Sequence, residues 1–117
     1  MTTTIWHNPR CSKSRQTLAL LEEQGVTPII RLYLEDVPSA GEVNDMVSKL
    51  GITPWELLRR GEKVFKELEL TQQGGDQAII EAMAAHPILI ERPIVVRGKK
   101  AVLGRPPENV LILFDQP

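Results

Sequence analysis

The first 34 residues carry the pattern that most limits the fold, because they predict a strand, a helix and a second strand in succession. Residues 2–6 are β-branched and aromatic, and an Asn-Pro pair soon after them marks the end of this strand. A helix is predicted over 12–24 with Gly25 as its stop, and the run TPIIRLYL predicts a strand over 27–34. Such a unit places its two strands parallel, joined by a right-handed crossover.

The rest of the chain supplies several helices and then a hairpin. The predicted elements are a helix over 43–50 closed by Gly51, a helix from Thr53 to about Arg60 opened by a capping box with Glu56, a helix capped by Asp76 and ending near His86-Pro87, a hairpin of 94–96 with 101–103, and a short helix or turn over 107–113. Because a hairpin can extend a parallel pair with antiparallel strands, we expect an α/β fold with a mixed four-stranded sheet.

Length and composition favour one soluble globular domain over 1–117. The chain has 117 residues, of which 42% are hydrophobic and 25% charged, and its net charge of -1 gives no field that would favour nucleic acid or an anionic membrane. No stretch approaches the roughly 18 apolar residues of a membrane span. The start lacks the basic and apolar regions of a signal peptide. We therefore expect a cytoplasmic protein with no nucleic-acid or membrane partner.

The single cysteine, Cys11, precedes the first predicted helix and has His7, Arg10, Lys13 and Arg15 around it. A lone cysteine is most often a small buried hydrophobe. Here the neighbouring charges must reach water, and both cations and a helix N-terminus lower a thiol pKa. We therefore favour a reactive thiolate, tuned by these basic neighbours.

Spacing argues against three other cysteine chemistries. A phosphatase loop needs arginine six positions after the cysteine, where this chain has Thr17, and a redox dithiol needs a second cysteine at Ser14. One cysteine and two scattered histidines fall short of the four ligands of structural zinc, so no metal site is expected. Ser14, like Ser12, can instead cap the helix or donate a hydrogen bond to the thiolate.

Three arginines beside predicted element boundaries are candidates for binding an oxyanion: Arg59, Arg92 and Arg105. For any one of them, a solvated surface arginine is the commoner case. Arg92 and Arg105 directly precede prolines, which stiffens the backbone and aims the guanidinium, a group that binds oxyanions through two parallel hydrogen bonds. Because only about 5–6% of X-Pro bonds in folded proteins are cis, frequency alone predicts a trans Arg92-Pro93 bond.

Five motifs lie in one order along the chain: WHNPRCSKSR at 6–15, YLE at 33–35, LLRR at 57–60, HPILIERPIVV at 86–96 and GRPPE at 104–108. In this order the chain resembles the glutaredoxin-linked arsenate reductases. The resemblance implies a thioredoxin-like fold with a helical insertion over about 39–86, between the second strand and the C-terminal hairpin. It also implies that Pro93 follows a cis bond, against the frequency argument.

The resemblance further implies that Cys11 is the nucleophile, with His7 and Ser14 beside it in the catalytic loop. Arg59, Arg92 and Arg105 match the family's oxyanion-binding arginines, although Arg60 stands next to the first of them. Arsenate or a similar oxyanion would be the substrate and no cofactor would be bound. Since the chain has one cysteine, glutathione is expected as the reducing co-substrate and glutaredoxin as a partner.

Two other functions stay open at the level of sequence. The chain could be a monothiol glutathione-dependent oxidoreductase of the same fold with another substrate, in which the arginines bind glutathione carboxylates. A related branch of this fold acts as a redox-sensing regulator that binds RNA polymerase. Those regulators typically carry Cys-x-x-Cys, so Ser14 argues against this alternative.

Overall fold

The computed structural model describes residues 1–114, which form parts of two compact units. The sheet unit contains Met1–Asp36 and the described residues from Arg92 onward, and the helical unit contains Val37–Glu91. The helical insertion predicted over about 39–86 falls within the helical unit. The assignment of 1–117 to one domain stays a prediction.

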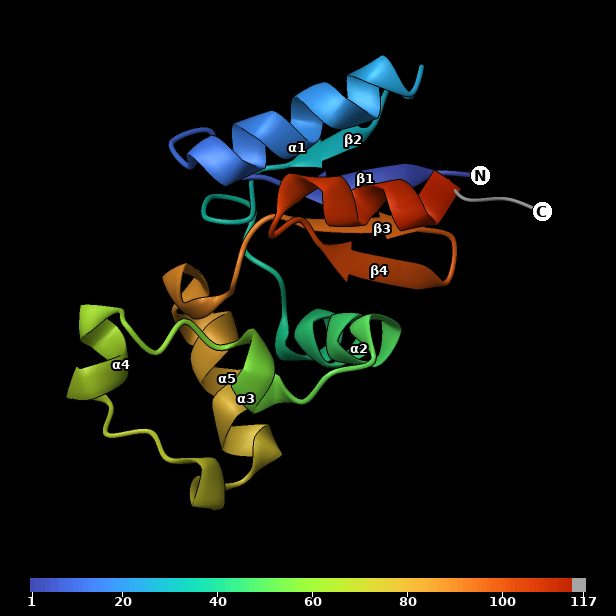
Figure 1. The fold of residues 1–117 in the computed structure, drawn as a ribbon. Helices are drawn as coiled ribbons and strands as arrows, with labels where there is room; N and C mark the ends of the chain where they lie inside the picture. The colour runs from blue at the N-terminus through green and yellow to red at the C-terminus, as the bar shows by residue number, and fades with distance from the viewer. Residues whose placement is uncertain (115–117) are drawn as a thin grey trace. The chain divides into compact units, whose positions relative to one another are not determined.

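The sheet unit is built on four strands in the order β2-β1-β3-β4 (Figure 1). The strands are β1 Thr3–Trp6, β2 Ile29–Arg31, β3 Ile94–Arg97 and β4 Lys100–Leu103. Strands β1 and β2 are parallel, whereas β3 pairs antiparallel with both β1 and β4. The predicted mixed four-stranded sheet is therefore confirmed.

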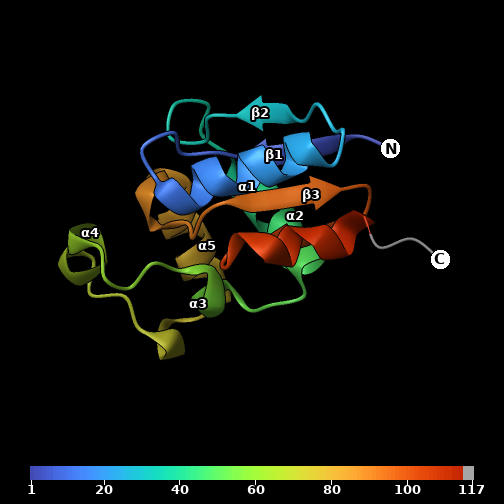
Figure 2. The ribbon, with the colours of Figure 1, turned by 45° about the horizontal axis from the view of Figure 1, so that its top comes forward.

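One face of this sheet is covered by α1 Ser12–Glu23 and the 3-10 helix η3 Pro107–Phe114 (Figure 2). Strand alternation turns Ile5 and Val95 toward this face, where they pack with Leu21 of α1 and with Val110 and Leu113 of η3. These five side chains are buried. They hold β1 and α1 in fixed positions, and so fix both sides of the loop that contains Cys11.

The second predicted strand was too long, since only Ile29–Arg31 of the predicted 27–34 is strand. The carbonyl of Leu32 accepts hydrogen bonds from the N–H groups of Glu35 and Asp36, so the chain turns directly after β2. Tyr33, at 1% exposure, anchors this turn by stacking on Trp6, with 6.4 Å between the ring centres. Periodicity alone did not reveal the turn, because Leu32 and Leu34 continue the apolar pattern.

The helical unit contains four α-helices and two short 3-10 helices. These are α2 Ala40–Leu50, α3 Pro54–Leu57, α4 Lys63–Glu67, η1 Gln72–Gly74, α5 Asp76–Ala85 and η2 Pro87–Leu89. Val43, Met46 and Val47 are buried on α2, and Ile79 and Met83 are buried on α5. Helices α4, η1 and η2 were not predicted from the sequence.

Capping explains where two of these helices begin and end. Helix α2 starts at Ala40, three residues before the predicted start, because Ser39 and Glu42 form a capping box. Helix α3 has the predicted Thr53–Glu56 capping box but ends at Leu57 instead of Arg60. It ends there because Leu58 forms an antiparallel bridge with Ile90.

Asp76 was wrongly predicted to cap α5, since the N-cap is Gly75 and Asp76 is the first helical residue. Gly75 has a φ of 98°, a backbone conformation that glycine adopts without strain. None of the helices within residues 1–114 has the length and hydropathy that a membrane span requires.

Candidate functional site

Cys11 is the N-cap residue of α1, with extended backbone torsions of φ -95° and ψ 122°. Its N–H donates to the carbonyl of Asn8 at 3.0 Å, and its own carbonyl accepts from the N–H of Arg15. No side chain caps α1, so the capping role expected of Ser12 or Ser14 is not observed. The thiol is partly exposed at the N-terminus of α1.

The groups around Cys11 favour the thiolate. Burial on its own would raise the pKa of the thiol, but the backbone N–H of Ser14 and the Arg92 guanidinium hydrogen-bond the sulfur and lower it. The positive charge of Arg92 and the N–H of Lys13 lower this pKa further, and the result lies below the ordinary value. A thiolate is both the nucleophilic form of cysteine and the form that two first-turn N–H groups stabilise.

Ser14 and His7 form a buried pair beneath the loop. The His7 Nδ1 atom lies 2.6 Å from the Ser14 Oγ atom, which also accepts the Asn8 N–H at 3.0 Å. Burial and the charge of Arg15 lower the pKa of His7, so the ring is neutral at pH 7. This arrangement favours a Ser14 hydroxyl that donates to Nδ1 and a His7 proton on Nε2. Ser14 therefore ties α1 to the strand-end loop.

Two basic sequence neighbours of Cys11, Arg10 and Arg15, make contacts with the loop itself. Arg15 donates to the carbonyl of Pro9 at 2.8 Å and so braces the loop. Arg10 is exposed, and its N–H donates to the Asn8 side chain at 3.0 Å. The cation that lowers the thiol pKa is Arg92, 81 positions further along the chain.

Arg92 and Arg105 are brought together at the start of β3 and the end of β4. Arg105 Nη1 donates to the carbonyl of Arg92 at 3.0 Å. The Arg92-Pro93 bond is cis, which confirms the expectation from family resemblance and overturns that from frequency; Arg105-Pro106 is also cis. The structure thus gathers Cys11, His7, Ser14 and these two arginines in the sheet unit.

Two residues that the sequence did not single out as site residues, Thr17 and Gly104, hold the arginine-bearing segments against α1. A Cβ atom on Gly104 would lie 2.6 Å from Thr17 Oγ1 and 2.8 Å from Pro93 Cγ. The Gly104 N–H donates to the carbonyl of Pro93 at 2.9 Å. Only glycine permits this approach, and the glycine directly before Arg105 was the signal that could have indicated it.

Arg59 lies in the helical unit, where two carboxylates hold it. Its Nε is 3.1 Å from Glu62 Oε2 and its Nη1 is 2.7 Å from Glu91 Oε1. The contact with Glu91 arises because the N–H of Arg59 donates to Leu89 and the N–H of Glu91 donates to Leu57, which aligns the two segments. The neighbouring Arg60 is exposed and stacks on Trp55 at 4.9 Å.

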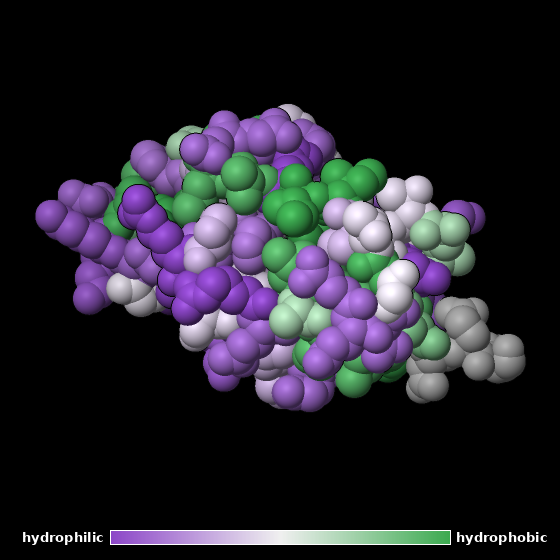
Figure 3. Space-filling view, turned by 90° about the horizontal axis from the view of Figure 1, so that it is seen from above, coloured by the Kyte–Doolittle hydropathy of each residue, from purple (hydrophilic) through white to green (hydrophobic). Residues whose placement is uncertain are grey.

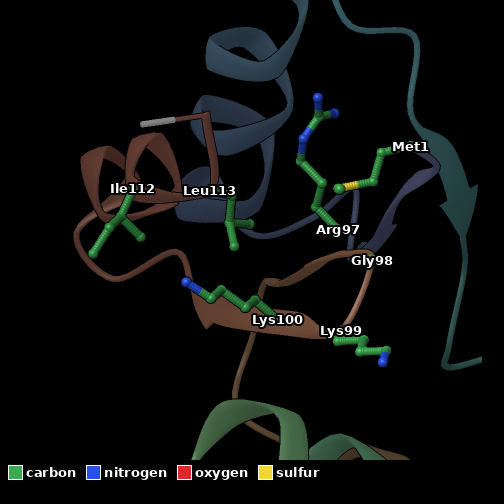
Figure 4. A pocket seen from close by; sticks show the side chains of 7 residues that line it. All are labelled: Met1, Arg97, Gly98, Lys99, Lys100, Ile112 and Leu113. Atoms are coloured by element: carbon green, nitrogen blue, oxygen red, sulfur yellow. The ribbon is translucent and has the colours of Figure 1, made fainter. Parts of the chain in front are cut away.

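A separate pocket of about 510 Å³ lies at the opposite end of β3 from Arg92 (Figure 4). It is lined by Met1, Arg97, Gly98, Lys99, Lys100, Ile112 and Leu113. Arg97 pairs with Thr3 at the start of β1, whereas the Cys11 loop follows the end of β1. The pocket therefore contains none of the site residues named above. Among the described residues, no three His, Cys, Asp or Glu side chains converge as metal ligands would.

Comparison with known proteins shows similarity over most of the chain. The profile of the ArsC family matches residues 6–113. The chain belongs to the ArsC family. An ArsC-family protein named arsenate reductase from Haemophilus influenzae is 48% identical over 113 residues, which cover 95% of this chain and 97% of that protein. YfgD of Escherichia coli K12, named an uncharacterized protein, is 50% identical over 109 residues, 92% of each chain.

A solved ArsC-family structure confirms the fold. The structure named arsenate reductase from Vibrio cholerae is 50% identical, covers 96% of this chain and 97% of its own, and superposes with a TM-score of 0.93. The α/β architecture with its mixed four-stranded sheet is therefore the thioredoxin-like fold of the ArsC family, as the resemblance implied. The roles of individual side chains follow from chemistry and stay proposals.

Proposed function

We propose that this protein is an arsenate reductase in which Cys11 is the nucleophile and glutathione and glutaredoxin supply the electrons. The observation that carries the proposal is the place of Cys11 at the N-terminus of α1, where Arg92 and the first-turn N–H groups lower the pKa of the thiol. The names of relatives such as the Haemophilus influenzae protein support arsenate as the substrate.

In the first step the Cys11 thiolate attacks arsenic(V), and one arsenate oxygen leaves as water after protonation. The covalent product is a thiol–arsenate adduct that keeps its negative charge. Arg92 and Arg105, which lie together because the Arg105 side chain donates to the Arg92 carbonyl, would hold that charge through hydrogen bonds to the remaining oxygens. The neutral His7 and Ser14 would keep the loop in place while the sulfur changes its bonding.

Reduction follows when a glutathione thiolate attacks the Cys11 sulfur. The electron pair of the sulfur–arsenic bond passes to arsenic, which leaves as arsenite, and Cys11 is left in a mixed disulfide with glutathione. A glutaredoxin thiolate then attacks the glutathione sulfur and releases the Cys11 thiolate. Two thiolates have thus supplied the two electrons that arsenic(V) gains.

Arg59 is the third proposed arginine, and its ion pairs set a condition on substrate binding. An arsenate oxygen must compete with Glu62 or Glu91 for the guanidinium. Glu62→Gln removes one charged competitor without removing Arg59. We expect this variant to bind arsenate more tightly than the wild type.

The decisive assay measures arsenate-dependent NADPH oxidation in a mixture of this protein, glutathione, glutaredoxin and glutathione reductase. Turnover is expected, and Cys11→Ser should abolish it because the only thiol of the chain is lost. Cys11→Ser is a matched control, since it removes the nucleophile and little volume. Absence of arsenate-dependent NADPH oxidation at every substrate concentration would contradict the proposal. Turnover of another glutathione disulfide instead would favour the oxidoreductase alternative.

A further inference from the structure

Strand β2 and the turn after it carry exposed apolar side chains that the proposed chemistry does not use. Ile29, Ile30, Leu32 and Leu34 are 57%, 48%, 36% and 36% exposed, respectively; together they are called the β2 patch. Seen from above, hydrophobic side chains gather over α1 and β2, with hydrophilic ones around them (Figure 3). Such a group of exposed apolar side chains on one short segment marks an interaction surface more often than scattered apolar residues do.

The β2 patch lies at the same end of the sheet as Cys11. Trp6 and Arg31 are register partners on the parallel strands β1 and β2, and the N–H of His7 donates to the carbonyl of Arg31 at 2.8 Å. Leu32, the residue after Arg31, therefore lies close to His7. Neighbouring strands lie about 4.8 Å apart and the Asn8–Cys11 turn spans less than about 7 Å, so the thiol is on the order of 10–15 Å from Leu32.

This position identifies the kind of molecule that covers the patch. A protein that exchanges a disulfide with Cys11 must bring its sulfur into bonding contact there. An ordinary protein interface covers about 800 Å² on each partner, a disc of roughly 16 Å radius, and such a disc centred on Cys11 includes Leu32. We propose that the β2 patch is the docking surface for the glutaredoxin-class reductase that releases Cys11 from its mixed disulfide with glutathione. The inference rests on the proposed function.

Charge adds a second requirement for the partner. Residues 1–21 contain no Asp or Glu, and both Arg10 and Arg15 are exposed beside Cys11. Asp36, at the far end of the turn, is paired with Arg31 at 3.4 Å. The matching surface therefore has an apolar centre, which meets Leu32 and Leu34, and acidic groups that face Arg10 and Arg15.

A second copy of this chain fits the β2 patch less well. Strand β2 has three residues, and Pro28 before it has no N–H to add to a ladder between copies. Edge-to-edge pairing would thus form few hydrogen bonds. Dimerisation through β2 is instead an outcome that the test must detect.

The test starts from a mixed disulfide made without arsenate. Oxidised glutathione converts Cys11 to its glutathione disulfide, which a mass increase identifies without ambiguity because the chain has one thiol. Glutaredoxin with glutathione then reduces it, and intact mass at successive times gives the rate. The same measurement with dithiothreitol reports the intrinsic accessibility of the disulfide, since this small reagent needs no docking surface.

The informative variant is Leu32→Ser with Leu34→Ser, which removes the apolar side chains without adding charge. Its matched control is Ile112→Ser, since Ile112 is 65% exposed and lines the pocket at the other end of the sheet. We expect the double variant to slow glutaredoxin about tenfold, equal to about 1.4 kcal/mol, and to leave the dithiothreitol rate unchanged. Ile112→Ser should behave as the wild type with both reductants.

Three results would overturn the proposal. The first is a double variant that glutaredoxin reduces as fast as the wild type, because the partner would then recognise glutathione alone. The second is equal slowing with dithiothreitol, which would mean that the leucines only support the Cys11 loop. The third is a wild-type dimer that the double variant dissociates. The docking test contains no arsenate. A failure of arsenate turnover would therefore contradict the proposed function without deciding the docking proposal.

Discussion

Strand β3 has an arginine near each end, and the two arginines have different roles. Arg92, just before the strand, hydrogen-bonds the Cys11 sulfur and lowers the pKa of the thiol. Arg97, the last residue of the strand, donates from Nη1 to Thr3 Oγ1 at 2.8 Å and lies 4.6 Å from the centre of the Phe114 ring. One guanidinium acts on a reactive group, whereas the other secures η3 to the sheet.

The difference teaches that positive charge by itself does not define the candidate site. The pocket beside Arg97 also contains Lys99 and Lys100, so it too is cationic (Figure 4). It has no nucleophile and no first-turn N–H groups of a long helix. The chemistry arises where a cation, a helix start and a thiol meet.

The largest expected effect comes from Arg92→Ala. Loss of the guanidinium removes a hydrogen bond and a charge that favour the thiolate, so the pKa of Cys11 rises and less thiolate exists at pH 7. If Arg92 also holds the arsenate oxyanion, kcat/KM should fall about 10²–10³-fold. The rate of alkylation by iodoacetamide, measured against pH, should show its midpoint at higher pH than in the wild type.

Arg92→Lys separates charge from geometry in this experiment. Lysine keeps the positive charge but lacks the fork of donors, so the alkylation midpoint should move less than in Arg92→Ala. An unchanged midpoint in Arg92→Ala would show that the helix start alone sets the thiol pKa.

Arg97→Ala should lower stability without changing the thiol. Removing the contact with Phe114 and the hydrogen bond to Thr3 is expected to cost about 1–2 kcal/mol of unfolding free energy, which urea denaturation measures. The alkylation midpoint of Cys11 should match the wild type. A shift of this midpoint toward the Arg92→Ala value would show that Arg97 also acts on the thiol, and would contradict separate roles for the two arginines.

The smallest expected effect is a pH dependence of stability from His7. Its folded pKa is lowered by burial and by Arg15, so the folded state resists protonation more than the unfolded state, which titrates near about 6.5. Stability is therefore kept above about pH 6.5 and lost as the pH falls toward the folded pKa. The lowered pKa of Cys11 acts in the same direction at higher pH.

Urea midpoints at pH 7.5 and 5 test this dependence, with His7→Gln as a comparison that cannot titrate. The wild type should lose more stability between the two pH values than His7→Gln does. Equal losses in the two proteins would assign the pH dependence to other groups.

Sequence reasoning predicted the sheet because its signals were local. The β-branched run that forms β1 and the hairpin of β3 and β4 need only the pattern of their own residues. The length of β2 was wrong for a reason outside that pattern, since Tyr33 stacks on Trp6 and turns the chain after Arg31. The end of this strand therefore depends on Trp6, which precedes Tyr33 by 27 positions.

Within the site, the sequence indicated the residue types but not their contacts. Cys11 and the arginines before prolines stood out by spacing, whereas the choice of Arg92 over Arg10 or Arg15 as the cation on the sulfur depends on how β3 pairs with β1. The carboxylates on Arg59 depend on the bridge of Leu58 with Ile90, which no local motif encodes.

The hydrogen bond from Arg105 to the carbonyl of Arg92 means that the two side chains do not vary independently. Replacing Arg105 removes a restraint on the backbone that aims Arg92, so the Arg105 substitution already includes part of the loss of Arg92. In a double-mutant cycle their free-energy changes will therefore fail to add. Adding the two single-substitution effects would count the shared interaction twice.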